Sequence, residues 1–336
     1  MKREKIKDLF DVALEGIEYI DAVLHDEAKE DPLIWEILGH LHEIAQLLET
    51  TLQNETDLLH QVVLYSGNVQ ASIEDTWKDH SLLTRIFSLE IRPFVLEMKK
   101  LWELATNVLQ NKETVTSYRQ DIMQQITTMH NADPKPYKYD VSILLLAYNK
   151  LEYTRQAVES IFQYTDFSKG NIEFITLNNG SDDGTREYFE SLPHTKKINL
   201  KHNIIGTFAY THVLDGKYFI GFSNDVVATQ HWLDNLLAAM QSDDHIAIAV
   251  PVCNENTISN YQEVPIPYRY TFNDMDKMQV FAAAYNHQNP MLWEDRSQLM
   301  PFIAIMRSDL IPFCAADPMY TKYEFIDDDM STLFRR

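Results

Sequence analysis

The sequence predicts an α/β protein in which a mainly parallel sheet follows an all-helical region. Residues 141–150, 172–185 and 219–229 each begin with a short apolar run of strand length and end at polar residues. A helical stretch over residues 151–164 separates the first two runs. The order strand, helix, strand is typical of parallel sheets that are buried on both faces. Before them, residues 1–131 show helical periodicity nearly throughout.

The expected helical region covers residues 1–131. Apolar side chains recur there at the spacing of one helical face, first at Ile6, Leu9, Phe10, Ala13, Leu14, Ile17 and Ile20 and again at Ile34, Ile37, Leu38, Leu41, Ile44 and Leu48. Asp31 and Pro32 separate the two stripes and are expected to start the second helix. Further helices are expected at about 69–90, 93–110 and 114–130. The region is either a bundle that only packs its own stripes or a module for partner docking, including homo-oligomerisation.

Residues 132–138 are predicted to be a linker, because prolines and turn-forming residues gather there. The α/β domain is then expected over residues 139–336. Two more buried strands are predicted within it, at 245–253 and 302–306. The aromatic-rich segment between these strands, residues 254–301, is expected to be largely loop and is a candidate acceptor region.

Composition excludes several classes of function. The net charge of −21 argues against nucleic-acid binding, which needs concentrated positive charge. The longest apolar runs are far shorter than the roughly 20 residues that span a bilayer. Cys253 and Cys314 are the two cysteines, too few for a disulfide framework, and they show no metal-ligand spacing. A cytoplasmic location is therefore expected, with a peripheral position at the inner face of a membrane as the alternative.

The three apolar runs end in motifs that carry polar side chains. The first ends at Ala147, Tyr148 and Asn149, the second at the turn 178–185, and the third at residues 223–225. In open parallel sheets, ligands bind outside the carboxyl ends of the strands. The sequence therefore predicts a site for a polar ligand at this edge of the sheet.

These motifs, in this order, resemble the family 2 glycosyltransferases of the GT-A fold. The segments that carry the resemblance are AYNK at 147–150, NNGSDDGT at 178–185, HNIIGTFA at 202–209, FSNDVVAT at 222–229 with the following Trp232 and Leu233, and FIDDDMS at 325–331 ahead of Arg335 and Arg336. The resemblance covers about Asp140 to Arg336. It implies a GT-A (Rossmann-like) nucleotide-sugar-binding domain.

The activity implied is an inverting transfer of a hexosyl or N-acetylhexosaminyl group from a nucleotide-sugar, with a UDP-sugar favoured. The implied acceptor is a hydroxyl group of a saccharide, a lipid-linked molecule or a protein, in the synthesis of surface polysaccharide or glycoconjugates. Which sugar and which acceptor are used is left open by the motifs.

The resemblance assigns a set of donor-binding residues: Ala147, Tyr148, Asn149, Asn178, Asn179, Ser181, Asn203, Asn224 and Asp225. The Tyr148 ring would lie against the base. Asn178 and Asn179 stand where relatives commonly carry an acid that accepts from the N3–H of uracil. An amide oxygen can accept the same hydrogen bond, although more weakly than a carboxylate. The identity of the base is therefore open. The alternative for the tyrosine motif is a strand end followed by an Asn helix cap.

Ser223, Asn224 and Asp225 occupy the position of the family's D-x-D motif, and Asp225 retains its acid. Mn²⁺ or Mg²⁺ bridging two donor phosphates needs hard oxygen ligands and acts as a Lewis acid on the leaving group. Asp225 is therefore the expected metal ligand, and Asn224 is a candidate contact to ribose or to a metal-bound water. The alternative is a simple turn after a buried strand.

Within the acidic cluster, the resemblance places the general base at Asp327, or at Asp328 if the motif is shifted by one residue. Inverting transfer needs one carboxylate to take the proton of the acceptor hydroxyl. Neighbouring acids raise one another's pKa, which suits a base that works near neutral pH. The alternative is a solvated acidic helix start favoured by the helix dipole.

Two further interpretations stay open. The departures at Asn178, Asn179 and Ser223 also fit a nucleotide-sugar-binding pseudoenzyme whose helices form an interaction module. A nucleotidyltransferase is less favoured, because no G-x-G-T-R loop follows the first strand. The family pattern continues beyond the basic pair, so the chain is also expected to be a piece of a longer protein, truncated at its C-terminal end.

Overall fold

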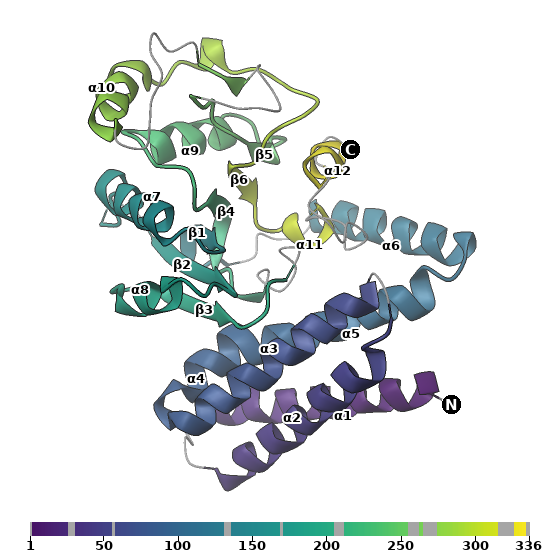
Figure 1. The fold of residues 1–336 in the computed structure, drawn as a ribbon. Coiled ribbons are helices and arrows are strands. Elements are labelled where there is room, and N and C mark those ends of the chain that lie inside the picture. The colour runs from purple at the N-terminus through teal and green to yellow at the C-terminus, as the bar shows by residue number, and fades with distance from the viewer. Residues whose placement is uncertain are drawn as a thin grey trace.

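The computed structural model describes residues 2–25, 31–55, 58–130, 136–168, 171–204, 212–254, 262–264, 274–314 and 326–333 (Figure 1). Within these ranges, helices come first and a sheet with flanking helices follows. Of the predicted linker, residues 132–135 lie outside the described part. Nowhere in the described ranges is a helix long and apolar enough to cross a membrane.

The helical region consists of α1 (Lys2–His25), α2 (Pro32–Leu52), α3 (Leu58–Lys78), η1 (His80–Leu82), α4 (Leu83–Ile86), η2 (Phe87–Ile91), α5 (Arg92–Glu103), η3 (Leu104–Val108) and α6 (Lys112–His130). Asp31 caps α2 as expected, because its side chain accepts a hydrogen bond from the Leu33 N–H at 2.9 Å. The helix expected at 69–90 is wrong in its bounds. Asp79 ends α3 and caps the next helical turn by accepting from Ser81.

The sheet follows, with strands β1 (Tyr139–Ala147), β2 (Ile172–Asn179), β3 (Lys196–Leu200), β4 (Gly216–Ser223), β5 (Ile248–Ala249) and β6 (Ile303–Arg307). The order across the sheet is β3-β2-β1-β4-β6-β5. Strands β3, β2, β1 and β4 are parallel, and β6 is antiparallel to both of its neighbours. This confirms the predicted α/β class with a mainly parallel sheet preceded by helices.

The remaining helical segments are α7 (Leu151–Tyr164), α8 (Thr185–Ser191), α9 (Trp232–Ser242), α10 (Met275–Tyr285), η6 (Pro290–Leu292), α11 (Ile311–Cys314) and α12 (Ile326–Leu333). The strand expected at 245–253 is short, spanning only Ile248 and Ala249. Pro251 lacks the N–H that would continue the ladder. Helix α10 was not anticipated, because residues 254–301 were expected to be largely loop.

The two faces of the sheet are buried by different parts of the chain. Val141, Ile143 and Leu145 face a core that includes α7 and α9. On the opposite face, Leu144, with Ile175, Leu177 and Ile198, joins the core of the helical region. This second core runs continuously from α1 to the sheet (Figure 1). The helical region therefore shares one continuous core with this face of the sheet.

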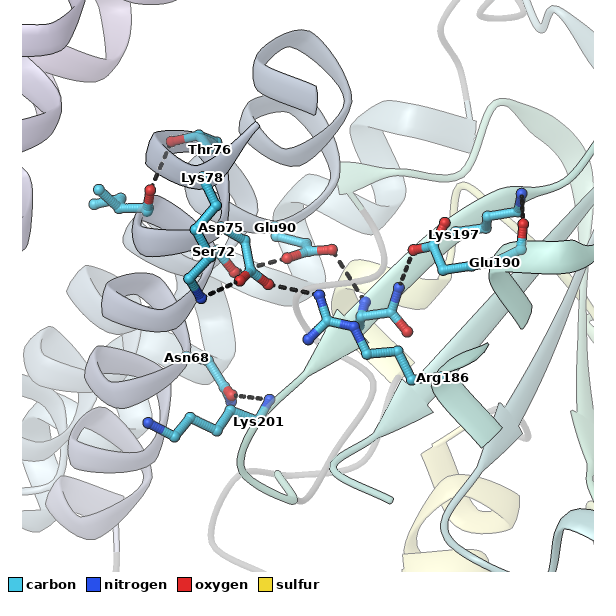
Figure 2. Close-up of polar contacts among 12 residues, drawn as sticks. Asn68, Ser72, Asp75, Thr76, Lys78, Glu90, Arg186, Glu190, Lys197 and Lys201 are labelled. Atoms are coloured by element: carbon cyan, nitrogen blue, oxygen red, sulfur yellow. Dashed lines mark hydrogen bonds and ion pairs between the residues drawn. The ribbon is translucent and has the colours of Figure 1, made fainter. Parts of the chain in front are cut away.

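Strand β3 lies at the edge of the sheet, and side chains of the helical region pair with its outer backbone groups (Figure 2). Arg85 donates to the carbonyl of Lys197 at 3.2 Å. Glu90 accepts from the N–H of Asn199 at 3.0 Å, and Asn68 accepts from the N–H of Lys201 at 2.9 Å. Alternate residues of a strand direct their backbone groups to the same side. The helical region therefore satisfies an edge that would otherwise be unpaired.

Glu90 is the buried acid of this interface, with 3% of its surface exposed. One carboxylate oxygen accepts from Asn199 and the other accepts from the Ser72 hydroxyl at 2.7 Å. Burial raises the pKa of Glu90 to about 7, although these hydrogen bonds and the charge of Arg85 act in the opposite direction. Around the interface, Arg186 of α8 also pairs with Asp75 of α3 at 2.6 Å.

Glu90 should make stability depend on pH. A raised carboxyl pKa means that the protonated form is the one favoured by folding. The stability that protonated Glu90 contributes is complete below the ordinary pKa of 4.5 and is lost as pH rises to about 7. As pH rises from 4.5 to 8, the wild type should lose this contribution and Glu90→Gln should not. The free energy of unfolding of the variant, relative to that of the wild type, should therefore increase by roughly 1–3 kcal/mol, at about 1.4 kcal/mol per pKa unit.

Denaturant titrations of both proteins across this pH range measure the difference. Glu187→Gln is the matched control, because the Glu187 carboxylate is exposed and the substitution removes the same charge. A difference between Glu90→Gln and wild type that does not change with pH would contradict the assignment.

The fragment 1–131 is predicted to fold on its own. Ile34, Leu38 and Leu48 of α2 are fully buried among helices of the same region. We expect a helical circular-dichroism spectrum with a midpoint below that of the full chain, because the face that covers the sheet becomes exposed. A random-coil spectrum would show that the helices depend on the sheet.

Candidate functional site at the carboxyl edge of the sheet

The strand register brings the predicted motifs to one edge of the sheet. Ala147 at the end of β1 lies beside Asn178 of β2, and Leu146 lies beside Ser223 of β4. β6 runs in the opposite direction, so its first residue, Ile303, pairs with Phe222 near the same edge. The edge predicted from the sequence therefore exists in the fold.

Asn149 joins three of the motifs through its backbone and side chain. Its N–H donates to the Ser181 hydroxyl at 2.8 Å, and its side-chain oxygen accepts from the Asp182 N–H at 3.0 Å. Its carbonyl accepts from the Asn224 amide at 3.0 Å. The residue adopts φ 57°, which asparagine tolerates better than most residues. Asn149 therefore connects the ends of β1, β2 and β4 through hydrogen bonds rather than acting as a helix cap.

The start of α7 is held by a different residue, Asp183. Its carboxylate accepts from the Leu151 N–H at 2.8 Å and from the Thr185 hydroxyl at 2.6 Å. Burial acts to raise the pKa of Asp183, but these hydrogen bonds outweigh it and hold that pKa below its ordinary value. Asp183 therefore stays ionised and fixes the turn to the helix.

The side chains of Asn178 and Asn179 are buried and engaged within the protein. The Asn178 oxygen accepts from the Ser181 N–H at 2.9 Å. The Asn179 oxygen accepts from the Ile204 N–H at 2.9 Å, while its amide nitrogen donates to the Ile204 carbonyl at 3.1 Å and to the Asn203 side chain at 3.3 Å. The oxygens expected to accept from a base thus shape the turn in this structure.

Asn224 is also fixed from within. Its amide nitrogen donates to the Asn149 carbonyl and to the hydroxyl of Thr154, which lies 2.9 Å away and is fully buried. Thr154 was not anticipated from the sequence, since a single threonine in the first turn of a helix is an ordinary feature. The amide oxygen of Asn224 is the remaining acceptor of this side chain.

Exposed side chains at this edge are available to a ligand. Tyr148 exposes 49% of its surface, and Asp182 and Asp225 are exposed. In the described residues, no group of three or more His, Cys, Asp or Glu side chains could hold a metal. The donor set therefore fits a divalent cation only when a ligand such as a diphosphate supplies further oxygens. Asp225 would then be the protein carboxylate and the Asn224 oxygen a weaker partner.

The acidic cluster lies on α12, which bonds to the segment leading into β6. Ser331 of this helix accepts from the Leu299 N–H at 3.0 Å, and Asp328 accepts from the Gln298 amide. The segment after Leu299 enters β6, where the carbonyl of Phe302 accepts from the Ser223 N–H at 3.0 Å. α12 is therefore anchored to the segment that pairs with the end of β4, two residues before Asp225.

Asp327 and Asp328 differ in their surroundings. Asp327 is partly buried, and burial together with the neighbouring Asp328 raises the pKa of Asp327. Asp328 is engaged by Gln298. A partly buried carboxylate with a raised pKa is suited to accept a proton.

Several expected features lie outside the described residues. They are 205–209 of the HNIIGTFA segment, Tyr261, Tyr268, Tyr270 and Phe272 of the candidate acceptor region, and the basic pair Arg335 and Arg336. Tyr285 and Trp293 of that region expose 46% and 37% of their surfaces. Helix α10 is attached to the segment after Asp225, because Asn286 donates to the Thr229 hydroxyl at 2.6 Å.

Comparisons with known proteins relate part of the chain to glycosyltransferases. Residues 142–290 match the family model of glycosyl transferase family 2. An uncharacterized glycosyltransferase from Haemophilus influenzae is 29% identical over 117 residues, covering 32% of this chain. The match covers 34% of that relative's own length.

Solved structures also resemble the chain. A TarS fragment from S. aureus in complex with UDP-GlcNAc has 16% identity, a TM-score of 0.41 and coverage of 58% of this chain and 53% of its own. The mannosyltransferase PcManGT from Pyrobaculum calidifontis, in complex with GDP-Man and Mn²⁺, has 13% identity and a TM-score of 0.38, with coverage of 65% and 60%.

The family match includes β1, β2 and β4, the strands whose ends form the edge described above. The predicted α/β class, with a mainly parallel sheet preceded by helices, is seen directly in the strand order. Residues 142–290 of this chain are therefore similar to glycosyl transferase family 2.

Proposed function

We propose that this chain transfers a sugar from a nucleotide-sugar to an acceptor hydroxyl with inversion at the anomeric carbon. The observation that carries the proposal is the convergence of Tyr148, Asp182 and Asp225, all exposed, at the edge to which α12 and its acids are anchored. The family match supports sugar transfer from a nucleotide-sugar.

In the proposed donor complex, the Tyr148 ring lies against the base. Asp225, with the Asn224 oxygen, holds Mn²⁺ or Mg²⁺ together with the diphosphate. The cation supplies positive charge that stabilises the departing nucleoside diphosphate. In a protein with a net charge of −21, this charge also offsets the repulsion of an anionic donor.

The chemical step assigned to the chain's own residues is a proton transfer. As the acceptor oxygen forms its bond to the anomeric carbon, the bond from that carbon to the leaving phosphate oxygen breaks. Asp327 takes the proton of the acceptor hydroxyl, so that no charged intermediate of the acceptor accumulates. The raised pKa of Asp327 is the property that supports this role.

We propose a class of donor and a class of acceptor, each defined by the group that takes part in the reaction. A UDP-sugar carrying a hexosyl or N-acetylhexosaminyl group is favoured, and the acceptor is a saccharide, lipid-linked or protein hydroxyl. Surface polysaccharide or glycoconjugate synthesis is the corresponding role. A cytoplasmic location, or the inner membrane face for a lipid-linked acceptor, stays a proposal.

A second candidate function is a nucleotide-sugar-binding protein without transfer activity. It is favoured by the internal engagement of Asn178 and Asn179, since these amides take the place of the acid expected to read the base. Binding of a nucleotide-sugar without turnover, across a broad acceptor panel, would support this alternative.

Asp225→Asn should abolish metal-dependent donor binding, because the amide removes the negative charge from the metal ligand. Calorimetric titration of UDP-sugars and GDP-sugars, with and without Mn²⁺, measures the effect. Asp234→Asn is the matched control, because the Asp234 side chain is 83% exposed on α9. Unchanged Mn²⁺-dependent binding by Asp225→Asn would remove Asp225 from the metal site.

Asp327→Asn should leave donor affinity nearly unchanged and reduce turnover by roughly a hundredfold or more, the usual scale for a lost general base. In the wild type, activity should fall as pH decreases through the raised pKa of Asp327, since the base must be ionised. The acidic limb should therefore lie above the ordinary aspartate value of 3.8.

A glycosyl-transfer assay paired with donor titration measures both effects. Asp328→Asn is the comparison variant, and its loss should be smaller because Gln298 already engages that carboxylate. If both variants retain full activity, the acidic cluster takes no part in the reaction.

A further inference from the structure

We propose that Asn68 of α3, in the helical region, is a positioning residue for the donor site. This inference rests on the proposed function, because it concerns the same edge of the sheet. It assigns to the helical region a part in donor binding that neither the motifs nor the family match contains, since that match begins at residue 142.

The first step is the contact between α3 and the turn after β3. Asn68 is fully buried. Its side-chain oxygen accepts from the N–H groups of Lys201 and His202 at 2.9 Å and 2.8 Å, and its nitrogen donates to the carbonyl of His202 at 3.0 Å. A single amide thus pairs with three backbone groups of one turn.

The preceding residue, Gly67, lets the turn approach the helix closely. A Cβ atom at this position would lie 2.8 Å from the ring of His202. The ring therefore occupies the space that a side chain would fill. Gly67 and Asn68 together form the surface of α3 against which residues 201 and 202 pack.

Residues 201–204 also contact the turn at 178–185, which follows β2 and is called the donor-site turn below. On the other side of residues 201–204, Asn179 pairs with both backbone groups of Ile204. Gly180 has φ 83°, and a Cβ there would lie 2.9 Å from the backbone nitrogen of Asn203. Residues 201–204 are therefore held between α3 and the end of β2.

The donor-site turn is hydrogen-bonded in turn to the residues at the edge of the sheet. Ser181 and Asp182, directly after Gly180, bond to Asn149, and Asn149 bonds to Asn224 beside Asp225. The links in this path are hydrogen bonds of backbone and amide groups, one hydrogen bond to the Ser181 hydroxyl, and the close approach at Gly180. Moving residues 201–204 away from α3 removes the support behind the donor-site turn.

Other contacts of the same interface provide a control. Arg186 pairs with Asp75 of α3, but Arg186 lies on α8, outside the turn at 201–204. Arg186→Ala should weaken the interface without moving the donor site. Loss of stability is thereby separated from loss of positioning.

The variant Asn68→Ala removes the side-chain contacts to all three backbone groups. We expect its dissociation constant for nucleoside diphosphate with Mn²⁺, and its donor KM, to rise about tenfold or more. At saturating donor, kcat should change less than threefold, because the proposed base, Asp327, lies on α12 and is not part of the path that Asn68 supports. Arg186→Ala should retain wild-type donor affinity, although its unfolding midpoint falls.

The conservative variant Asn68→Asp provides a rescue test and a substitute if Asn68→Ala does not fold. A protonated aspartic acid accepts with one oxygen and donates with the other, as the amide does. Burial favours the protonated form. Donor affinity of Asn68→Asp, relative to wild type at the same pH, should be nearly normal near pH 5 and reduced near pH 8.

Hydrogen exchange separates this inference from the proposed function. The amides of Asn149, Ser181 and Asp182 should exchange faster in Asn68→Ala than in Arg186→Ala, whether or not a donor binds. If the wild type binds no nucleotide-sugar, the proposed function fails while exchange still tests the link. Unchanged exchange at these amides, or wild-type donor affinity in folded Asn68→Ala, would overturn the inference.

Discussion

The structure depends on the outer edge of β3, where backbone groups are buried under a second layer of the protein. A buried N–H or carbonyl without a partner costs as much as a lost hydrogen bond. Arg85, Glu90 and Asn68 supply those partners, each from a different part of the helical region. Apolar residues of both parts also share one core, so the helical region and the sheet are packed together as well as hydrogen-bonded.

This arrangement links stability to the candidate site. The interface that covers β3 continues into residues 201–204, and the same residues support the turn after β2. Glu90, whose pKa burial raises to about 7, lies in this interface. The protonation state of one carboxyl group therefore bears on how firmly the helices hold the sheet near neutral pH.

The candidate site combines rigid amides with few exposed acids. Asn149, Asn179 and Asn224 bond within the protein and define the shape of the edge. In the proposed function, Asp225 and the acids of α12 are the charged groups, as metal ligand and general base. An acidic protein that binds an anionic donor needs such a division, because each additional exposed carboxylate would repel the diphosphate.

The sequence by itself determined the α/β class, the edge at which the motifs meet, and the local elements. Helix 151–164 begins and ends as expected. Apolar periodicity and turn chemistry are local properties, so they can be recognised without a fold. The tertiary structure decided the rest. The contact between Asn68 and Lys201 joins residues 133 positions apart, and it depends on which face of the sheet the helices cover. The internal partners of Asn179, and the support of Asn224 by Thr154, likewise follow from topology. No periodicity encodes such contacts, because a side-chain hydrogen bond is specified by positions in space.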